Sequence, residues 1–287
     1  MSTPVTVTSS VDADGIGWIV FDDPASRANV FNPPTQAALR AAIETLAAQP
    51  VKAVVVLSGK EKIFIAGADL KWLGKIATPA EGQDASRAGH ALFGMLEQFK
   101  VPVVCAIHGA CAGGGYELAL ACHWRLASDA KETVIGLPEV GIGLIPGWGG
   151  CARLPRLIGA KAAVEHILKA QLLPAPEAHR AGLIDEVVPA AELKARAKAA
   201  ALRLAASGRP ARTAGQPADA AFFAEQRKTA LARLRGQPAP LAVLDTVEQG
   251  AAHRSRPRSS SRRRGSARSR PATSRTTSST SSSLRTR

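Results

Sequence analysis

The sequence predicts an α/β protein with a helical C-terminal region and a basic tail. Short β-branched apolar runs, such as VKAVVVL at 51–57, alternate with stretches of helical period up to about residue 190. Residues 191–250 show only helical patterns, and serine, threonine, arginine and proline dominate 251–287. Strand–helix alternation favours parallel strands, right-handed crossovers and a sheet buried between layers. We therefore expect three regions: a core over 1–190, a helical region over 191–250 and a disordered tail over 251–287.

The elements of the first part begin with a β-hairpin. Residues 5–22 alternate around the turn-forming DADGIG and end in a strand over 17–21. In TQAALRAAIETLAA, apolar residues recur at helical intervals, which predicts an amphipathic helix over 35–48. Further along, the pattern predicts a strand at 51–57, a small-residue turn at 64–69, helices at 70–76 and 80–99, and a strand at 101–107.

The later elements continue the alternation and then become helical. Glu139 falls in a segment expected to be extended, just before a glycine-rich loop at 141–150. Strands are expected at 133–136 and 184–188. Helices are expected at 116–127, 151–158, 160–170, 175–181, 192–206, 218–235 and 241–248.

The positive charge of the chain is concentrated in the tail. The formal net charge is +14, and residues 251–287 hold eleven arginines and no acid, so the rest of the chain carries only 14 − 11 = +3. Such a tail could bind RNA, DNA or an anionic surface by counterion release. Two alternatives are a solvated disordered tail and a shift of the reading frame near Ala251. Nucleic acid is therefore an unlikely partner of the folded part.

Other features of the composition indicate a soluble, cytoplasmic protein. No apolar run approaches the roughly 20 residues that span a bilayer, and the N-terminus has neither the basic nor the apolar region of a signal peptide. Four cysteines lie between 105 and 151, but none forms a C-x-x-C pair and their spacing suggests no metal site. We expect reduced, buried thiols.

Two small-residue turns are candidates for binding an oxygen that becomes negative. One is Gly113, Gly114 and Gly115, between an apolar run and a helical segment, and the other is AGAD at 66–69. Unpaired N–H groups at such a junction suit a developing oxyanion, and small residues let a ligand approach the backbone. Alternatively, the glycines only permit helix–strand packing.

Two acids in apolar surroundings are candidates for proton transfer. Glu117 lies three residues after Gly114 in the apolar stretch ELALAC, and Glu139 follows Leu137-Pro138. If they converge, one could accept a proton from water while the other supplies one. The alternatives are that Glu117 is merely favoured at a helix N-terminus and that Glu139 is exposed to solvent.

Four segments together resemble the crotonase, or enoyl-CoA hydratase/isomerase, superfamily. They are FIAGADLK at 64–71, VPVVCAIHGACAGGGYELALACHWRLAS at 101–128, IGLPEVGIGLIPGWGGCARLPRLIG at 135–159 and AGLIDEVVP at 181–189. Their order and spacing are highly specific, and the resemblance covers about residues 5–188. It implies a spiral of ββα turns that binds a bent acyl-CoA with its thioester oxygen in an oxyanion hole.

The resemblance also implies roles for individual residues. The oxyanion N–H groups would come from Ala68 and Gly114. The Ala66 carbonyl would meet the adenine amino group and Lys71 the phosphates of coenzyme A. Glu117 and Glu139 match the two glutamates of the hydratases, the first activating water and the second protonating C2. Gly67, Asp69, Gly113 and Gly147 complete the expected substrate-binding set.

The activity we expect is hydration of trans-2-enoyl-CoA in fatty-acid β-oxidation. The closest resemblance is to the hydratase portion of bifunctional fatty-acid oxidation proteins, from which the chain departs after Gly250. An isomerase that moves a Δ3 double bond to Δ2 is the alternative. Coenzyme A would be part of the substrate, and no metal or other cofactor is implied. The resemblance further implies a homotrimer or hexamer if the C-terminal helices are intact.

Overall fold

The structure is a computed structural model that describes residues 6–210, 215–233 and 237–255. Most of the expected tail, residues 256–287, lies outside the described residues. The helix α10 (Ala239–Ser255) continues past Ala251, where the sequence analysis placed the start of the tail. Ala251 and Ala252 are strong helix formers, so the helix continues into the first residues of the biased segment.

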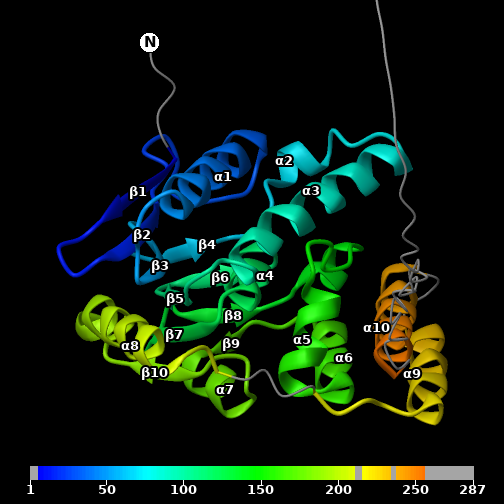
Figure 1. Cartoon of the computed structure of the whole chain (residues 1–287). Coiled ribbons are helices and arrows are strands. Elements are labelled where there is room, and N and C mark those ends of the chain that lie inside the picture. The colour runs from blue at the N-terminus through cyan, green and yellow to red at the C-terminus, as the bar shows by residue number, and fades with distance from the viewer. Residues whose placement is uncertain (1–5, 211–214, 234–236, 256–287) are drawn as a thin grey trace, which may run out of the picture. The chain divides into compact units, whose positions relative to one another are not determined.

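Six strands form the larger sheet, and all but the first pair are parallel (Figure 1). The N-terminal hairpin is confirmed, because β1 and β2 pair antiparallel. The strands follow the order β1 (Val7–Val11), β2 (Ile16–Phe21), β3 (Ala53–Ser58), β5 (Val103–Ile107), β7 (Trp124–Ser128) and β10 (Glu186–Val188).

A smaller sheet holds the short strands β4 (Ile63–Ile65), β6 (Ala110–Ala112), β8 (Val134–Gly136) and β9 (Leu173–Pro174). Along the chain, each of β3, β5 and β7 is followed by one of these short strands and then by helix. The helices are α2 (Leu70–Leu73) with α3 (Pro79–Glu97), then α4 (Gly114–Ala121), then α5 (Gly150–Ile158). This repetition is the expected spiral of ββα turns.

Both faces of the larger sheet are buried, which explains the continuous apolar runs. In β3, Val54 and Val56 join one hydrophobic cluster, while Ala53 and Val55 join the other. Helices α1 (Pro33–Ala47), α3 and α4 contribute to the first cluster, and α8 (Leu193–Ser207) covers the second (Figure 1). The four cysteines are buried thiols, as expected.

The remaining helices follow β8 and β9. They are α6 (Ala160–Lys169), α7 (Ala175–Arg180), α9 (Ala220–Arg233) and α10, with short 3-10 helices at η1 (Glu139–Ile142) and η2 (Ala190–Glu192). Helix α10 packs against α5, α6 and α9. Among the described residues, no helix is both long enough and apolar enough to cross a membrane.

Two local predictions were wrong. The helix expected over 116–127 ends at Ala121, and its last residues form β7, because Cys122 turns to an extended backbone and the His123 N–H donates to the Val103 carbonyl at 2.7 Å. Periodicity does not separate a short buried strand from a helix. Glu139 lies at the start of η1 and not in an extended segment, because the 3-10 turn brings the Gly141 N–H to the Pro138 carbonyl at 3.0 Å.

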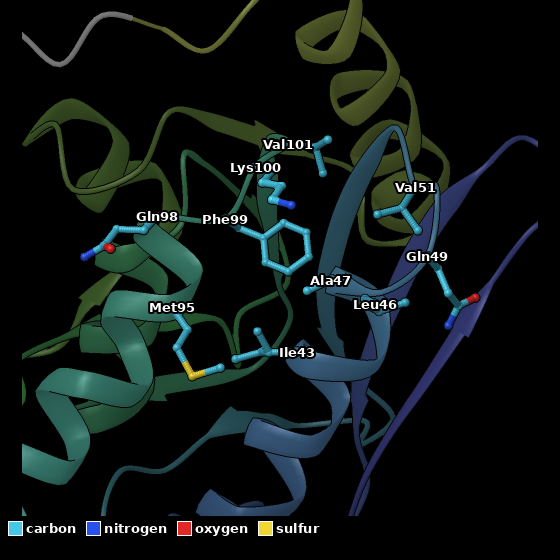
Figure 2. A pocket seen from close by; sticks show the side chains of 10 residues that line it. All are labelled: Ile43, Leu46, Ala47, Gln49, Val51, Met95, Gln98, Phe99, Lys100 and Val101. Atoms are coloured by element: carbon cyan, nitrogen blue, oxygen red, sulfur yellow. The ribbon is translucent and has the colours of Figure 1, made fainter. Parts of the chain in front are cut away.

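A pocket of about 440 Å³ lies where α1 and α3 end, away from the glycine turns. Figure 2 shows its lining, which is mostly apolar and comes from these helix ends and the loops that follow them. The residues are Ile43, Leu46, Ala47, Gln49, Val51, Met95, Gln98, Phe99, Lys100 and Val101.

Candidate active site

The triple-glycine turn connects β6 to α4 and presents an amide that the helix does not use. Gly113 has a φ of 54°, a conformation that favours glycine, and its N–H donates to the Gly136 carbonyl at 3.0 Å. Helix α4 then begins at Gly114, and its first internal bond runs from the Glu117 N–H to the Gly113 carbonyl at 2.9 Å. The Gly114 N–H precedes that bond, so the helix does not use it.

The second turn carries Ala68 between two bonds to Phe31. The Phe31 N–H donates to the Gly67 carbonyl at 2.8 Å, and the Asp69 N–H donates to the Phe31 carbonyl at 2.9 Å. In such a parallel bridge the residue between the two bonded neighbours directs its own N–H and C=O to the other side. The Ala68 amide therefore faces away from Phe31.

The two turns lie against each other. Gly67 has a φ of 102°, and a Cβ added to it would lie 3.1 Å from the Ala112 carbonyl oxygen and 3.6 Å from the Gly114 nitrogen. A side chain at Gly67 would therefore fill the space between the turns. This close approach explains why both turns consist of small residues.

One pocket of about 390 Å³ contains both turns and both candidate acids. Its lining residues are Ala66, Gly67, Ala68, Leu70, Leu73, Ile76, Gly82, Ala85, Ser86, Gly113, Gly114, Glu117, Pro138, Glu139, Ile142, Leu144, Ile145, Gly147 and Trp148. Eight of the ten residues expected at the site thus come together. The other two, Asp69 and Lys71, do not line it.

Asp69 precedes the helix α2 and Lys71 lies in it, next to the pocket. The Asp69 carboxylate caps α2 by accepting the Lys71 N–H at 2.8 Å. The Lys71 side chain is exposed. The binding roles expected for both residues stay predictions.

Glu117 is buried and held by two backbone amides. Its Oε1 accepts from the Trp148 N–H at 2.8 Å and from the Gly150 N–H at 2.7 Å, and the residue is only 2% exposed. Burial raises the pKa of Glu117 to about 7, and the two amides and the charge of Arg153 act in the opposite direction.

Glu139 faces the same pocket with fewer partners. Among the described residues, its buried Oε2 has no hydrogen-bond partner. Burial, and after it the negative charge of Glu117, raises the pKa of Glu139 to about 8. The two amides and the charge of Arg153 stabilise Glu117 as an anion, so Glu117 is the carboxyl of the pair whose charge is better compensated.

Sequence reasoning missed Trp148 and the amide of Gly150. The Trp148 indole packs against the rings of Phe31 and Phe93 and donates from Nε1 to the Ala85 carbonyl at 3.2 Å. Its backbone N–H then reaches Glu117. A lone tryptophan within the glycine-rich segment PGWGG was the available signal, since a large ring between glycines is often anchored by packing.

The repeated ββα units and the pocket at their strand–helix turns define the fold of the crotonase superfamily of enzymes. The sequence model described as enoyl-CoA hydratase/isomerase matches residues 12–236, and the chain belongs to this family.

Individual relatives agree with this assignment. The fatty acid oxidation complex subunit alpha of Shewanella amazonensis is 38% identical over 249 residues, which cover 83% of this chain and 35% of the relative. The chain thus spans about a third of that curated relative's length.

Solved structures share the fold. An enoyl-CoA hydratase from Bacillus anthracis is 27% identical with a TM-score of 0.65, and the match covers 86% of this chain and 91% of that one. DspI of Pseudomonas aeruginosa is 31% identical with a TM-score of 0.61, covering 85% and 93%.

Proposed function

We propose that this protein is an enoyl-CoA hydratase, which adds water reversibly to a trans-2-enoyl-CoA to give a 3-hydroxyacyl-CoA. The observation that carries the proposal is that the buried Glu117 and the half-buried Glu139 line one pocket with the amides of Ala68 and Gly114. Hydration needs a base for water, an acid for carbon and a site for a negative oxygen.

The amides of Ala68 and Gly114 serve the thioester oxygen. Attack of water at C3 moves negative charge to that oxygen in an enolate-like transition state. Two fixed N–H donors in a mostly apolar pocket stabilise this charge more than the neutral ground state. Loss of one such donor typically costs about 3–4 kcal/mol of barrier.

The two carboxyls divide the proton transfers. Glu117 is stabilised as an anion by two amides and the nearby Arg153, so it is the base that accepts the proton of water. The buried Oε2 of Glu139 has no hydrogen-bond partner among the described residues, and the charge of Glu117 acts on this carboxyl, so Glu139 retains a proton and delivers it to C2. Unequal surroundings thus assign the acid and the base.

The coenzyme A portion of the substrate binds beside α2. The Ala66 carbonyl meets the adenine amino group, and Lys71 meets the phosphates, both by family resemblance. Ala66 is exposed at the edge of the pocket, and Lys71 lies on the adjacent exposed helix, which supports these roles. The reaction itself requires no other cofactor.

We also propose a role in fatty-acid oxidation, by analogy with the Shewanella relative. The expected homotrimer or hexamer stays a prediction.

Hydration of crotonyl-CoA tests the proposal. We expect the purified protein to consume the absorbance of the conjugated enoyl thioester. Glu117→Gln and Glu139→Gln should each slow this by at least about 100-fold, since each removes a proton-transfer group. Glu177→Gln, which changes an exposed glutamate on α7, is the control and should leave the rate unchanged.

Two results would contradict the hydratase proposal. The first is full activity in both active-site variants. The second is conversion of a 3-enoyl-CoA into a 2-enoyl-CoA without hydration, with only one of the two glutamates required. That second result would establish the isomerase alternative.

A further inference from the structure

Arg153 is a buried cation outside the pocket lining that contacts the backbone holding Glu117. It lies in the first turn of α5 and is 6% exposed. Its Nη1 donates to the Trp148 carbonyl at 2.9 Å, and its Nε donates to the Glu97 carboxylate on α3 at 3.0 Å. The guanidinium thus joins α3, α5 and the segment 148–150.

The contact to the Trp148 carbonyl fixes the amides on either side of it. The Trp148 carbonyl belongs to the peptide group between residues 148 and 149. The Trp148 N–H belongs to the peptide group just before it and the Gly150 N–H to the one just after it, and both donate to Glu117 Oε1. Gly149 supports the turn with a φ of 117°, and a Cβ there would collide with the Arg153 guanidinium. Freeing the carbonyl would let the peptide rotate and misalign both donors.

The positive charge of Arg153 favours the ionised Glu117 carboxylate, as do the two amides that Arg153 holds in place. Arg153 lowers the pKa of Glu117, although less than burial raises it. The other titratable groups around the two residues are Glu139 of η1, Cys151 and Arg156 of α5, and His90 and Glu97 of α3. Arg156 also approaches Glu97, at 3.7 Å, but its side chain is 44% exposed.

We propose that Arg153 is a positioning residue, which holds the Trp148 and Gly150 amides on the Glu117 carboxylate so that its other oxygen faces the substrate water. This inference rests on the proposed function, because it concerns the base of that reaction. Arg153 is not among the residues that line the pocket.

Three variants test the role of Arg153. In Arg153→Met, which loses both charge and donors, we expect kcat for crotonyl-CoA to fall about 10- to 100-fold with KM changed less than about threefold. The acidic limb of the kcat–pH profile should move to higher pH. Arg153→Lys keeps the charge, but an ammonium group cannot replace the planar guanidinium that donates to both the Trp148 carbonyl and Glu97. We therefore expect kcat to fall about tenfold while the acidic limb of the kcat–pH profile stays in place. Arg156→Met is the matched control and should behave like the wild type.

A titration without substrate separates this inference from the proposed function. In protein labelled with carbon-13 at the glutamate carboxyls, the Glu117 signal is assigned by its loss in Glu117→Gln. We expect it to titrate at higher pH in Arg153→Met and at the wild-type pH in Arg156→Met. If the wild type does not hydrate crotonyl-CoA but this shift appears, the proposed function fails and the role of Arg153 stands.

An unshifted Glu117 titration in Arg153→Met, together with unchanged kcat, would overturn the inference. If Arg153→Met does not fold, the Lys variant decides, because a folded Arg153→Lys with wild-type kcat also contradicts a positioning role.

Discussion

At the scale of single residues, Glu117 and Glu139 have similar apolar neighbours in the sequence but different hydrogen-bond partners in the folded protein. Both line one pocket, yet Glu117 receives two amide donors while the buried Oε2 of Glu139 receives none from the described residues. A buried carboxyl without donors is costly to ionise. The charge of an ionised Glu139 is therefore poorly compensated. This favours the protonated form that an acid catalyst needs, and it lowers the stability of the folded protein at high pH.

Glu139→Gln should stabilise the protein at alkaline pH. Because the pKa of Glu139 is raised in the folded state, the folded protein binds more protons than the unfolded chain between about pH 4.5 and 8, and stability falls as pH rises through that window. Above pH 8 the variant avoids the ionised carboxylate, and we expect it to gain several kcal/mol of stability at pH 9 and much less at pH 5.

Thermal melts of wild type, Glu139→Gln and Glu177→Gln at pH 5 and pH 9 measure this gain. Equal melting-temperature differences between wild type and Glu139→Gln at the two pH values would show that Glu139 does not resist ionisation.

Gly114→Ala should disturb the site through Trp148. The added Cβ would lie 2.8 Å from Trp148 Cζ3, and the indole is fixed between the rings of Phe31 and Phe93. We expect destabilisation of about 1–3 kcal/mol and a loss of roughly 100-fold in kcat, because Trp148 also anchors Glu117.

Gly94→Ala on α3 is the matched control for this substitution. Its Cβ would meet only Gln98 Nε2, at 3.9 Å, so it should raise helix stability by about 0.5–1 kcal/mol. Urea unfolding and steady-state kinetics of both variants check the contrast, and normal kinetics in Gly114→Ala would refute this explanation for the glycine.

At the scale of elements, Asn29 ties the oxyanion turn to the strands. Its Nδ2 lies within hydrogen-bond distance of the Phe21 and Phe64 carbonyls, at 3.0 and 3.1 Å, and of Ser58 Oγ at 2.9 Å. The backbone carbonyl of Asn29 accepts the Ala66 N–H at 2.9 Å. One buried amide thus connects β2, β3 and β4 at the start of the turn that carries Ala68.

Asn29→Ala should cost about 2–3 kcal/mol of unfolding free energy, because it removes the side-chain donor from the Phe64 carbonyl and one of the two donors from the Phe21 carbonyl. Asn32→Ala is the control, since Asn32 only caps α1 by accepting the Thr35 N–H at 3.0 Å, and its loss should cost about 1 kcal/mol. Urea denaturation measures both values. Equal losses in the two variants would contradict the tethering role of Asn29.

Elements with a clear period were predictable, and short buried strands were not. The helix α1 and the strand β3 lie within two residues of their predicted bounds, because amphipathic and β-branched patterns are distinct. The strand β6 has three residues and no period to detect, and WRLAS reads equally well as the end of a helix. Pairing with β5 and β10 makes the latter segment a strand.

At the scale of the whole molecule, the C-terminal helix α10 shares the main hydrophobic cluster with the catalytic core. Val243 and Leu244 are fully buried in the same cluster as Phe31, Tyr116 and Trp148. Burial against one cluster favours cooperative unfolding of the described residues.

Leu244→Ala should therefore destabilise the whole folded unit, by about 3 kcal/mol. All four tryptophans lie at or before residue 148, so their fluorescence reports on the core, while far-ultraviolet circular dichroism also reports on α9 and α10. We expect both signals to shift to lower urea concentration together. Leu231→Ala, at a side chain that is 63% exposed, should change stability by less than about 0.5 kcal/mol. An early transition seen by dichroism alone would mean that the helices unfold independently.

The sequence by itself determined the α/β alternation, the two small-residue turns and the two acids, because period, glycine content and a charge within an apolar run are local properties. Only the tertiary structure decided that the two turns meet and that Trp148 and Gly150 anchor Glu117. It also decided which acid is better stabilised as an anion. These features depend on contacts between segments 30 or more residues apart and on burial from several sides, which no local pattern specifies.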